Sequence, residues 1–305
     1  MELRHLRYFL VVAEEGQFTR AASRLAMQQP PLSQQIRLLE EEIGFELFER
    51  LPRGVVLTPA GKAFAQDAQR IIDGLQQSVE RAARIARGEL GTILIGLTSS
   101  ASFHPLTTEA IREFRRLHPD VGIDLVELNA AEINERLAGG LVHVAFLRKP
   151  VELPPGLSFE VLEEEPMVVA LPEDHPTLAG KQGRQADIAL RALADEPFIL
   201  VRRPGAPGMY ADILTVCREA GFSPNVVREV PRMLSGIKLV STGIGIALVP
   251  ASMQRYNQAG VVYRRLKKPH VLTAPLTLSF PTTQQNGAAS RFVEFVLGQF
   301  RQRPK

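Results

Sequence analysis

The stretch Phe18–Leu39, FTRAASRLAMQQPPLSQQIRLL, has the pattern of two short helices joined by a tight turn. Small residues at Ala21 and Ala22 let a second helix approach the first closely. Two prolines suit the first turn of that second helix, because N–H groups there have no partner inside the helix. Four apolar residues then recur at helical spacing and form a stripe to be buried: Leu32, Ile36, Leu39 and Ile43. The pattern predicts a helix-turn-helix.

The other side of the second predicted helix carries short polar side chains near its start. Amides, a hydroxyl and a guanidinium in that position suit the reading of base edges in a DNA major groove and the binding of phosphates. We expect DNA contacts from seven residues of this helix and of a hairpin after it: Gln29, Pro30, Pro31, Ser33, Gln34, Arg37 and Arg53. An ordinary helical hairpin with a polar outer face is the alternative, and the spacing alone leaves it open.

The segment after the second helix has the pattern of a two-stranded wing. Short extended runs at Leu47–Arg50 and Val55–Leu57 flank the turn sequence Pro52-Arg53-Gly54. At the tip of such a wing, Arg53 would contact the phosphate backbone or enter the minor groove, although a lone arginine on a hairpin is often only solvated. An apolar stripe also predicts a first helix over residues 2–15, packed beneath the other two.

These N-terminal residues resemble the LysR-type transcriptional regulators. The matching positions are Thr19, Ala21, Ala22, Leu25, Gln29, Pro30, Leu32, Ser33 and Ile36, followed by Leu38-Leu39-Glu40, Gly44, Leu47–Arg50 and Leu57–Gly61. The organisation of the remaining chain also fits. The resemblance implies a winged helix-turn-helix activator or repressor that responds to a small molecule. Two departures stand out: Gln28 replaces a usual serine, and Gln34 replaces a frequent arginine.

Composition indicates a globular protein of two or three domains. The chain has 305 residues, of which 45% are hydrophobic and 23% charged. The single cysteine, Cys217, excludes an internal disulfide, and no apolar run approaches a membrane span or forms a signal peptide. We therefore expect a cytoplasmic protein that does not bind a membrane.

Net charge does not by itself indicate DNA binding. The chain carries a formal charge of +3, yet its first sixty residues hold seven arginines and eight glutamates. Attraction to phosphates must therefore come from the placement of individual arginines, because bulk charge contributes little.

A long amphipathic helix follows the wing. Thr58-Pro59 is a helix start, and no proline interrupts the chain until Pro105. Apolar residues step by alternating fours and threes, the spacing of a coiled-coil seam: Phe64, Ala68, Ile71, Leu75, Ser78, Ala82 and Ile85. A helix of about 28 residues is about 42 Å long, which is too long for one small domain to cover. We expect the seam to form a homodimer, and packing on its own domain is the alternative.

We expect a hinge at Gly91. After it the pattern changes to alternating strands and helices, which predicts an α/β region with a largely parallel sheet. Predicted strands cover 93–97, 121–128, 142–147, 160–162, 167–171, 198–201, 226–229, 246–249 and 275–280. Predicted helices cover 106–117, 133–137, 188–193, 210–220, 233–241 and 291–300.

These patterns divide the chain into a DNA-binding domain, a linker and dimerisation helix, and an effector domain: 1–58, 59–89 and 90–305. The family resemblance implies that the effector domain is of the periplasmic-binding-protein type, with two crossovers near residues 161 and 267. Its two subdomains would then be 90–161 with 268–305, and 162–267. The resemblance further implies a homotetramer of two dimers joined through the effector domains.

Open α/β sheets bind ligands at the carboxyl ends of their strands. After the first predicted strand, Thr98, Ser99 and Ser100 offer hydroxyls next to a helix that starts near Pro105. Four further residues follow other strands: Asn129, Arg148, Arg202 and Arg203. Three arginines favour a negatively charged effector, such as a small carboxylate. Two alternatives remain open. The serines could form a plain turn, and Arg148 could form an internal ion pair with a residue such as Glu229.

The stretch Val201–Gly205, VRRPG, with Tyr210 beyond it, most resembles the subgroup of the family that senses aromatic-degradation metabolites such as muconates and benzoates. Arginine at the position of Arg203 usually follows proline in that subgroup, whereas here it follows Arg202. The sequence leaves open the effector's identity, the operator, the target genes and the direction of regulation. Promoter DNA, the effector and a second copy are the expected partners, with RNA polymerase as a further protein to consider.

The rival function is an α/β enzyme acting on a small acid, with an N-terminal helical interaction domain. Its motifs are missing, because no G-x-G-x-x-G follows a strand and neither G-x-x-x-x-G-K nor G-x-S-x-G occurs. The six histidines are scattered without metal-ligand spacing, and Cys217 reads as a buried small hydrophobe. We expect no catalytic residue, metal or cofactor. A transport-type binding protein is disfavoured because no signal peptide is evident.

Overall fold

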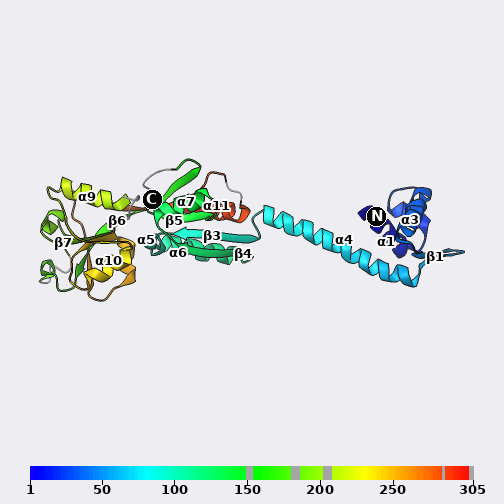
Figure 1. The fold of residues 1–305 in the computed structure, drawn as a ribbon, viewed down its shortest axis with the longest axis horizontal. Coiled ribbons are helices and arrows are strands. Elements are labelled where there is room, and N and C mark those ends of the chain that lie inside the picture. Colours follow the sequence, from blue (N-terminus) through cyan, green and yellow to red (C-terminus); the bar gives the residue numbers. More distant parts are fainter. Residues whose placement is uncertain (149–153, 180–185, 202–207, 284–285, 302–305) are drawn as a thin grey trace. The chain divides into compact units, whose positions relative to one another are not determined.

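The computed structural model describes residues 1–148, 154–179, 186–201, 208–283 and 286–301 (Figure 1). The chain forms two compact units, Met1–Arg84 and Ile85–Lys305. Each has its own hydrophobic core. No helix in these ranges is both long enough and apolar enough to cross a membrane.

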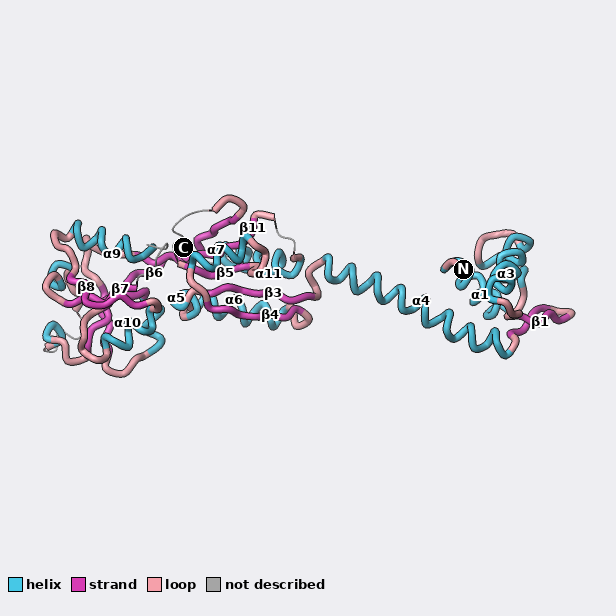
Figure 2. The backbone as a smooth tube through the Cα atoms, in the orientation of Figure 1, coloured by secondary structure: helices cyan, strands magenta, loops and turns pink. Residues whose placement is uncertain are grey.

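Three helices and a hairpin build the start of the first unit. The helices are α1 (Leu3–Glu15), α2 (Phe18–Arg24) and α3 (Gln29–Ile43). The hairpin pairs β1 (Phe48–Leu51) with β2 (Gly54–Leu57) in antiparallel register. The predicted helix over residues 2–15, the helix-turn-helix and the two-stranded wing are therefore confirmed (Figure 2).

Aromatic packing holds the hairpin and the next helix to this three-helix core. Phe9 of α1 is fully buried, and its ring centroid lies 5.3 Å from those of Phe48 and Phe64. Gly54 fixes the wing against the end of α1: a Cβ on it would lie 2.5 Å from the Gly16 carbonyl oxygen, so only glycine fits. The wing is therefore set in one place beside the helices.

The long helix α4 (Pro59–Ala86) has 28 residues, as its sequence pattern predicts. The Thr58 hydroxyl accepts a hydrogen bond from the Gly61 N–H at 2.8 Å and caps its first turn. Gly61 also lets the helix start close to the wing, since a Cβ there would meet the Leu47 carbonyl oxygen at 2.1 Å.

The second unit is organised around a seven-stranded sheet. Six strands follow the order β10-β6-β11-β5-β3-β4, and the seventh, β9, also pairs with β6. Their bounds are β3 (Gly91–Leu97), β4 (Val121–Glu127), β5 (Val144–Leu147), β6 (Leu157–Pro172), β9 (Ala247–Pro250), β10 (Val261–Arg265) and β11 (Thr273–Pro281). A separate parallel pair consists of β7 (Pro197–Val201) and β8 (Asn225–Val230). Strand β10 had no counterpart in the prediction.

The sheet is mixed, which corrects the expectation of a largely parallel one. Strands β4, β3 and β5 run parallel, but β11 pairs antiparallel with both β5 and β6, and β6 pairs antiparallel with β9 and β10. The physical reason is that β6 and β11 carry the chain between two subdomains as an antiparallel ribbon. No helical crossover is needed for such a pair.

Strand β6 is one continuous strand where the sequence predicts two short ones. The charged run Glu163–Glu165 and Pro166 reads as a loop, yet its backbone pairs with β11. Pairing with β11 extends to Pro166, and pairing with β9 starts at Met167. The change of subdomain therefore lies at Pro166–Met167 on the way out and beside Thr273 on the way back, a few residues after the predicted crossovers.

Helices cover both faces of the sheet in the first subdomain (Figure 1). On one face α6 (Pro105–Leu117) and α11 (Gly287–Arg301) meet through Phe114 and Phe292, whose ring centroids are 5.0 Å apart. On the other face α7 (Ala130–Ala138) packs against β5. The remaining helical elements are α5 (Ser99–Ser102), α9 (Gly208–Glu219), α10 (Met233–Val240), η1 (Pro176–Leu178), η2 (Leu190–Leu193) and η3 (Ala251–Tyr256).

Candidate functional site

The residues predicted to read DNA lie on the exposed side of α3. Gln29, Pro30 and Pro31 form its first turn and are exposed, as are Gln34 and Arg37, while Ser33 is half-buried. The opposite side supplies Leu32, Ile36 and Leu39, which are at most 2% exposed. The structure thus brings the predicted side chains together on one solvent-facing surface.

The arginines of residues 1–58 divide into paired and unpaired groups. Arg4 pairs with Glu2 at 3.0 Å, Arg24 with Glu14 at 2.6 Å, and Arg20 with Glu15 at 3.9 Å. Arg7, Arg37, Arg50 and Arg53 have no carboxylate partner in this fully described segment. Three of these four lie on α3 and on the wing: Arg37, Arg50 and Arg53. Their guanidinium groups are therefore available for contact with phosphates.

The wing tip is held in place by the second helix. The Gln17 side-chain amide at the start of α2 donates a hydrogen bond to the Arg53 carbonyl oxygen at 3.3 Å. The Arg53 side chain itself stays exposed. Its guanidinium is available near the start of α2 on a positioned backbone, an arrangement that suits contact with a phosphate.

The predicted coiled-coil seam of α4 needs a correction. Ala68 is fully buried in the core of its own unit, and Phe64 is half-buried against the same core, so this end of the row is covered largely by its own unit. Ile71, Leu75 and Val79, spaced by four residues, are 49%, 39% and 62% exposed, and Ala82 is exposed. The unpartnered apolar row therefore begins at Ile71, two turns after the predicted start at Phe64, and includes Val79, which the alternating spacing passes over.

The predicted effector residues lie at the carboxyl ends of neighbouring parallel strands. Thr98 and Ser99 follow β3, Asn129 follows β4, and Arg148 follows β5. The serines stand on the short helical turn α5 instead of an open loop. Ser100 is buried, and its carbonyl oxygen accepts a hydrogen bond from Arg148 at 2.8 Å. Arg202 and Arg203 lie outside the described residues.

Two of these polar residues differ in how their side chains are used. The Asn129 side-chain oxygen accepts the Glu132 N–H at 2.9 Å, and the Glu132 carboxylate accepts the Asn129 N–H at 2.9 Å. Asn129 is thus the cap of α7. The Thr98 hydroxyl, in contrast, is buried and has no hydrogen-bond partner.

Arg148 forms an internal ion pair, as the alternative prediction holds, but with Glu165 in place of Glu229. The side chains are 4% and 6% exposed, and a guanidinium nitrogen lies 2.5 Å from a carboxylate oxygen. Burial lowers the pKa of Arg148, and the neighbouring Glu165 carboxylate opposes that shift. Glu229 instead accepts a hydrogen bond from the Tyr210 hydroxyl at 3.0 Å. Arg148 is therefore neutralised and does not offer a free charge to an anion.

The ion pair also connects the two subdomains. Glu165 lies on β6 where the strand changes subdomain, and it accepts hydrogen bonds from the N–H and the hydroxyl of Ser252 at 2.6 and 2.8 Å. Ser252 belongs to η3 of the second subdomain, while Arg148 belongs to the first. Arg148 also donates to the Ala274 carbonyl oxygen of β11 at 3.3 Å. This buried network, Arg148–Glu165–Ser252, spans the junction.

His104 closes the N-terminus of α6, which corrects the expectation that this helix start holds an anion. Its Nδ1 accepts the Leu106 N–H at 3.2 Å, and the ring is 3% exposed. Nε2 lies 3.9 Å from a Glu165 oxygen. Burial lowers the pKa of His104, so the imidazole caps the helix in its neutral form. The His-Pro pair at residues 104 and 105 was the signal for this cap.

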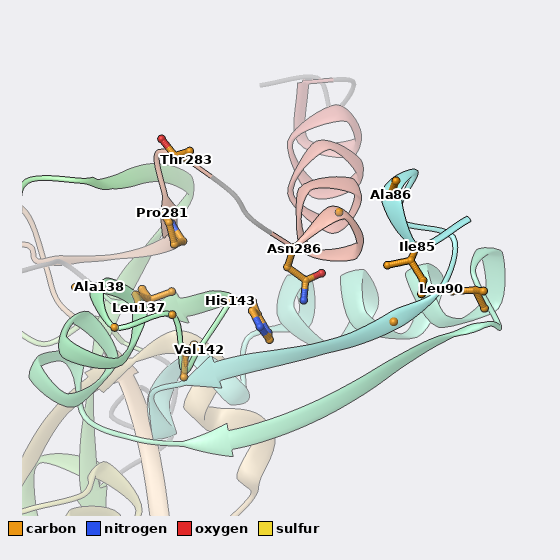
Figure 3. Close-up of a pocket in the computed structure, with 14 residues that line it drawn as sticks. Ile85, Ala86, Leu90, Leu137, Ala138, Val142, His143, Pro281, Thr283 and Asn286 are labelled. Carbon is orange, nitrogen blue, oxygen red and sulfur yellow. The ribbon is translucent and has the colours of Figure 1, made fainter. Parts of the chain in front are cut away.

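A cavity of about 610 Å³ lies at the opposite, amino-terminal end of the parallel strands (Figure 3). Leu137, Val142 and His143 line one side, while Ile85 and Asn286 line the other. None of the predicted effector residues lines it, and burial lowers the pKa of His143. Its position does not match the strand ends where open sheets bind ligands. Ile85, predicted as a dimer contact, faces this cavity.

The chain's one cysteine is not poised for thiol chemistry. Cys217 is fully buried within α9, and burial raises the pKa of its thiol to about 11. A thiol with so high a pKa is almost entirely protonated near neutral pH and reacts slowly. In the part of the chain that the structure describes, no group of three His, Cys, Asp or Glu side chains could hold a metal ion.

Comparisons with known proteins agree on one family. Residues 3–62 match the model of the bacterial regulatory helix-turn-helix protein, lysR family, and residues 86–301 match the LysR substrate binding domain. The transcriptional regulator AlsR of Bacillus subtilis is 39% identical over 96% of this chain and 94% of its own length. The regulator BudR of Raoultella terrigena is 37% identical over 96% of this chain and 99% of its own.

Solved structures extend this likeness to the whole fold. Full-length CbnR in complex with its target DNA superposes with a TM-score of 0.79 at 29% identity, covering 98% of this chain and 100% of that one. These relatives are transcription regulators, which removes the support for the enzyme alternative. The chain, with its exposed recognition helix, its wing and its two-subdomain α/β unit, belongs to the LysR family of DNA-binding transcriptional regulators.

Proposed function

We propose that this regulator binds promoter DNA in the cytoplasm through α3 and the wing, and that a small carboxylate bound between its two α/β subdomains controls it. The observation that carries the DNA-binding part is the joint placement of exposed polar side chains on α3 and of the unpaired Arg37, Arg50 and Arg53. Polar groups would read base edges there, while the arginines hold phosphates.

The effector part of the proposal rests on the strand ends after β3 and β4. Thr98 and Ser99 supply hydroxyls there, and the Thr98 hydroxyl is a buried group in need of a partner. Because Arg148 is neutralised by Glu165, a carboxylate would depend on Arg202 and Arg203 for opposing charge. Metabolites of aromatic degradation, such as muconates and benzoates, are the carboxylates to screen first.

Control by the effector would act through the angle between the two subdomains. A ligand shifts a conformational equilibrium only by binding its two states with different affinity. A carboxylate that contacts both subdomains meets this condition, because opening the cleft breaks half of its contacts. In a tetramer held by the α4 helices and by the effector domains, such a change would alter the spacing or the bend of the bound DNA.

Separate variants test the two kinds of DNA contact. Gln29→Ala should remove a base-edge contact and weaken binding to the cognate operator by about 1–3 kcal/mol. Arg53→Ala should weaken binding to all DNA sequences alike. It should also reduce the slope of the logarithm of the binding constant against the logarithm of salt concentration by about one unit. Fluorescence anisotropy on operator and scrambled DNA measures both. Equal losses on scrambled DNA for the two variants would overturn the assignment of base reading to Gln29.

A thermal-shift screen of small carboxylates tests the effector. A ligand present at about 100 times its dissociation constant should add roughly 2.7 kcal/mol of stability and raise the melting temperature. Ser99→Ala and Arg203→Ala should abolish that shift and the response in a reporter assay, while operator binding without ligand stays intact. A neutral effector, or a normal response of Ser99→Ala, would refute the proposal that a carboxylate binds between the subdomains. Neither result would contradict the DNA-binding role.

A further inference from the structure

The cavity at the amino-terminal end of the parallel strands, called the joint cavity below, lies where α4 enters the second unit (Figure 3). Its lining comes from the last turn of α4, the start of β3, the end of α7, the residues before β5, and the residues between β11 and α11. Ile85 and Ala86 end α4, and both belong to the second unit. The cavity is therefore contained in one unit and touches the end of the helix that leads to the other.

One wall of the joint cavity is closely packed. Just after α4, a Cβ on Gly88 would lie 2.2 Å from the Gly287 carbonyl oxygen, so the two backbones touch where α4 ends and α11 begins. Asn286 ties the same place to β3, because its Nδ2 donates to the Thr92 carbonyl oxygen at 3.1 Å and its Oδ1 accepts the Ala289 N–H at 3.1 Å. The end of α4 is thus held against α11 and β3, and the cavity separates this joint from α7.

Among the residues that the structure describes, no charged side chain lines the joint cavity. Its polar side chains are those of His143, Thr283 and Asn286. His143 is neutral, because burial lowers its pKa, and its Nδ1 accepts the Leu94 N–H at 2.8 Å, which leaves the ring proton on Nε2. An ion in this cavity would lose part of its hydration without meeting a counter-charge. The lining therefore favours an uncharged occupant.

We propose that the joint cavity binds a small uncharged molecule with an apolar body and a hydroxyl or amide group, and that this ligand alters DNA binding. Such a site goes beyond the proposed function, because no described residue of the proposed carboxylate cleft lines it. Its volume of about 610 Å³ is within the range of about 300–1,000 Å³ that small-molecule sites occupy. A ligand that touches both Ile85 of α4 and Ala138 of α7 would lose contacts when the end of α4 moves. Its binding would therefore favour one position of that helix.

The test attaches probes of different charge to the full-length protein. Ala138→Cys places a thiol at the joint cavity, while Cys217 is fully buried and reacts slowly. The matched control is Ala131→Cys, which is exposed on the same helix and does not line the cavity. Three methanethiosulfonate reagents of similar size attach a hydroxyethyl, an aminoethyl or a sulfonatoethyl group. Mass spectrometry measures each reaction rate, and fluorescence anisotropy measures operator affinity before and after labelling.

Relative to the control, Ala138→Cys should react about five times faster with the hydroxyethyl reagent than with either charged reagent, because both signs of charge lose hydration in the cavity. The hydroxyethyl adduct of Ala138→Cys should change operator affinity about threefold or more, and that of Ala131→Cys should leave it unchanged.

Three results would overturn the proposal. Equal rate ratios in the two variants would make the cavity a solvent-filled gap, and a preference for one sign of charge would indicate an ionic ligand. An unchanged operator affinity of the hydroxyethyl adduct of Ala138→Cys would refute control of DNA binding from this cavity. Failure of the unlabelled protein to bind the operator would instead refute the proposed function, while the reaction rates would still decide whether the cavity selects uncharged molecules.

Discussion

Removing the charge of Glu165 should destabilise the second unit more than any surface substitution in it. In Glu165→Gln the side chain keeps its size, so no cavity contributes to the effect. The Arg148 guanidinium, 4% exposed, would lose the carboxylate that lies 2.5 Å away and remain a buried charge without compensation. The new amide nitrogen cannot accept a hydrogen bond, so one of the Ser252 donors also loses its acceptor.

Breaking a buried ion pair by removing one partner costs about 3–5 kcal/mol. For a unit of this size each kcal/mol lowers the melting temperature by about 2–4 °C, so Glu165→Gln should lower it by about 10 °C. Differential scanning calorimetry of the full chain measures this. The control is Glu164→Gln on the same strand, whose exposed carboxylate should change stability by less than about 0.5 kcal/mol.

A double variant separates the ion pair from other effects. Adding Arg148→Met to Glu165→Gln removes the uncompensated charge, so the double variant should recover at least half of the stability that Glu165→Gln loses. The coupling energy between the two substitutions should exceed about 1 kcal/mol. A loss below about 1 kcal/mol in Glu165→Gln, or an equal loss in Glu164→Gln, would refute the view that this network holds the subdomain junction together.

Three other changes probe the linker and the capped helix. Leu75→Lys should desolvate a charge in the exposed apolar row of α4 and yield monomers in light scattering, whereas Gln76→Lys beside it should not; an unchanged dimer would place the interface elsewhere. The folded-state pKa of His104 is lowered, so its contribution to stability is complete above the ordinary histidine pKa of about 6.5 and declines as the pH falls through the folded-state pKa. His104→Asn keeps a capping side chain and should flatten this dependence in urea titrations at pH 5 to 7.5; an unaltered dependence would assign it to another group. Gly88→Ala would set a Cβ 2.2 Å from the Gly287 carbonyl oxygen and should lower the melting temperature. Gly74→Ala has open space around the new Cβ and should raise the melting temperature by a small amount. Equal effects of the two substitutions would contradict the close contact at Gly88.

Local patterns predict most of the first unit because its elements are short and each has its own signal. Pro30 and Pro31 mark a helix start, Gly16 and Gly44 end helices in left-handed conformations, and Pro52-Arg53-Gly54 marks a turn. The seam of α4 was misplaced at Phe64 and Ala68 because apolar spacing shows which residues share a side of a helix. It does not show whether that side meets the same domain or another chain.

Long-range contacts explain the errors in the second unit. The charged run before Pro166 reads as a loop, since nothing local shows that β11, about a hundred residues later, supplies the backbone partners. Likewise Arg148 at a strand end reads as an anion site, and only the fold brings Glu165 against it. The location of the polar strand ends was predictable, whereas the pairing of their charges was not.

Binding of the full-length protein to the DNA upstream of its own gene tests the central claim most directly. A gel shift followed by footprinting should show a retarded complex with two protected half-sites about one helical turn, or a multiple of it, apart. Addition of a carboxylate identified by the thermal-shift screen should change the protected pattern. Absence of retardation by the wild-type protein, or a footprint that Gln29→Ala leaves unaltered in affinity and sequence preference, would contradict the account.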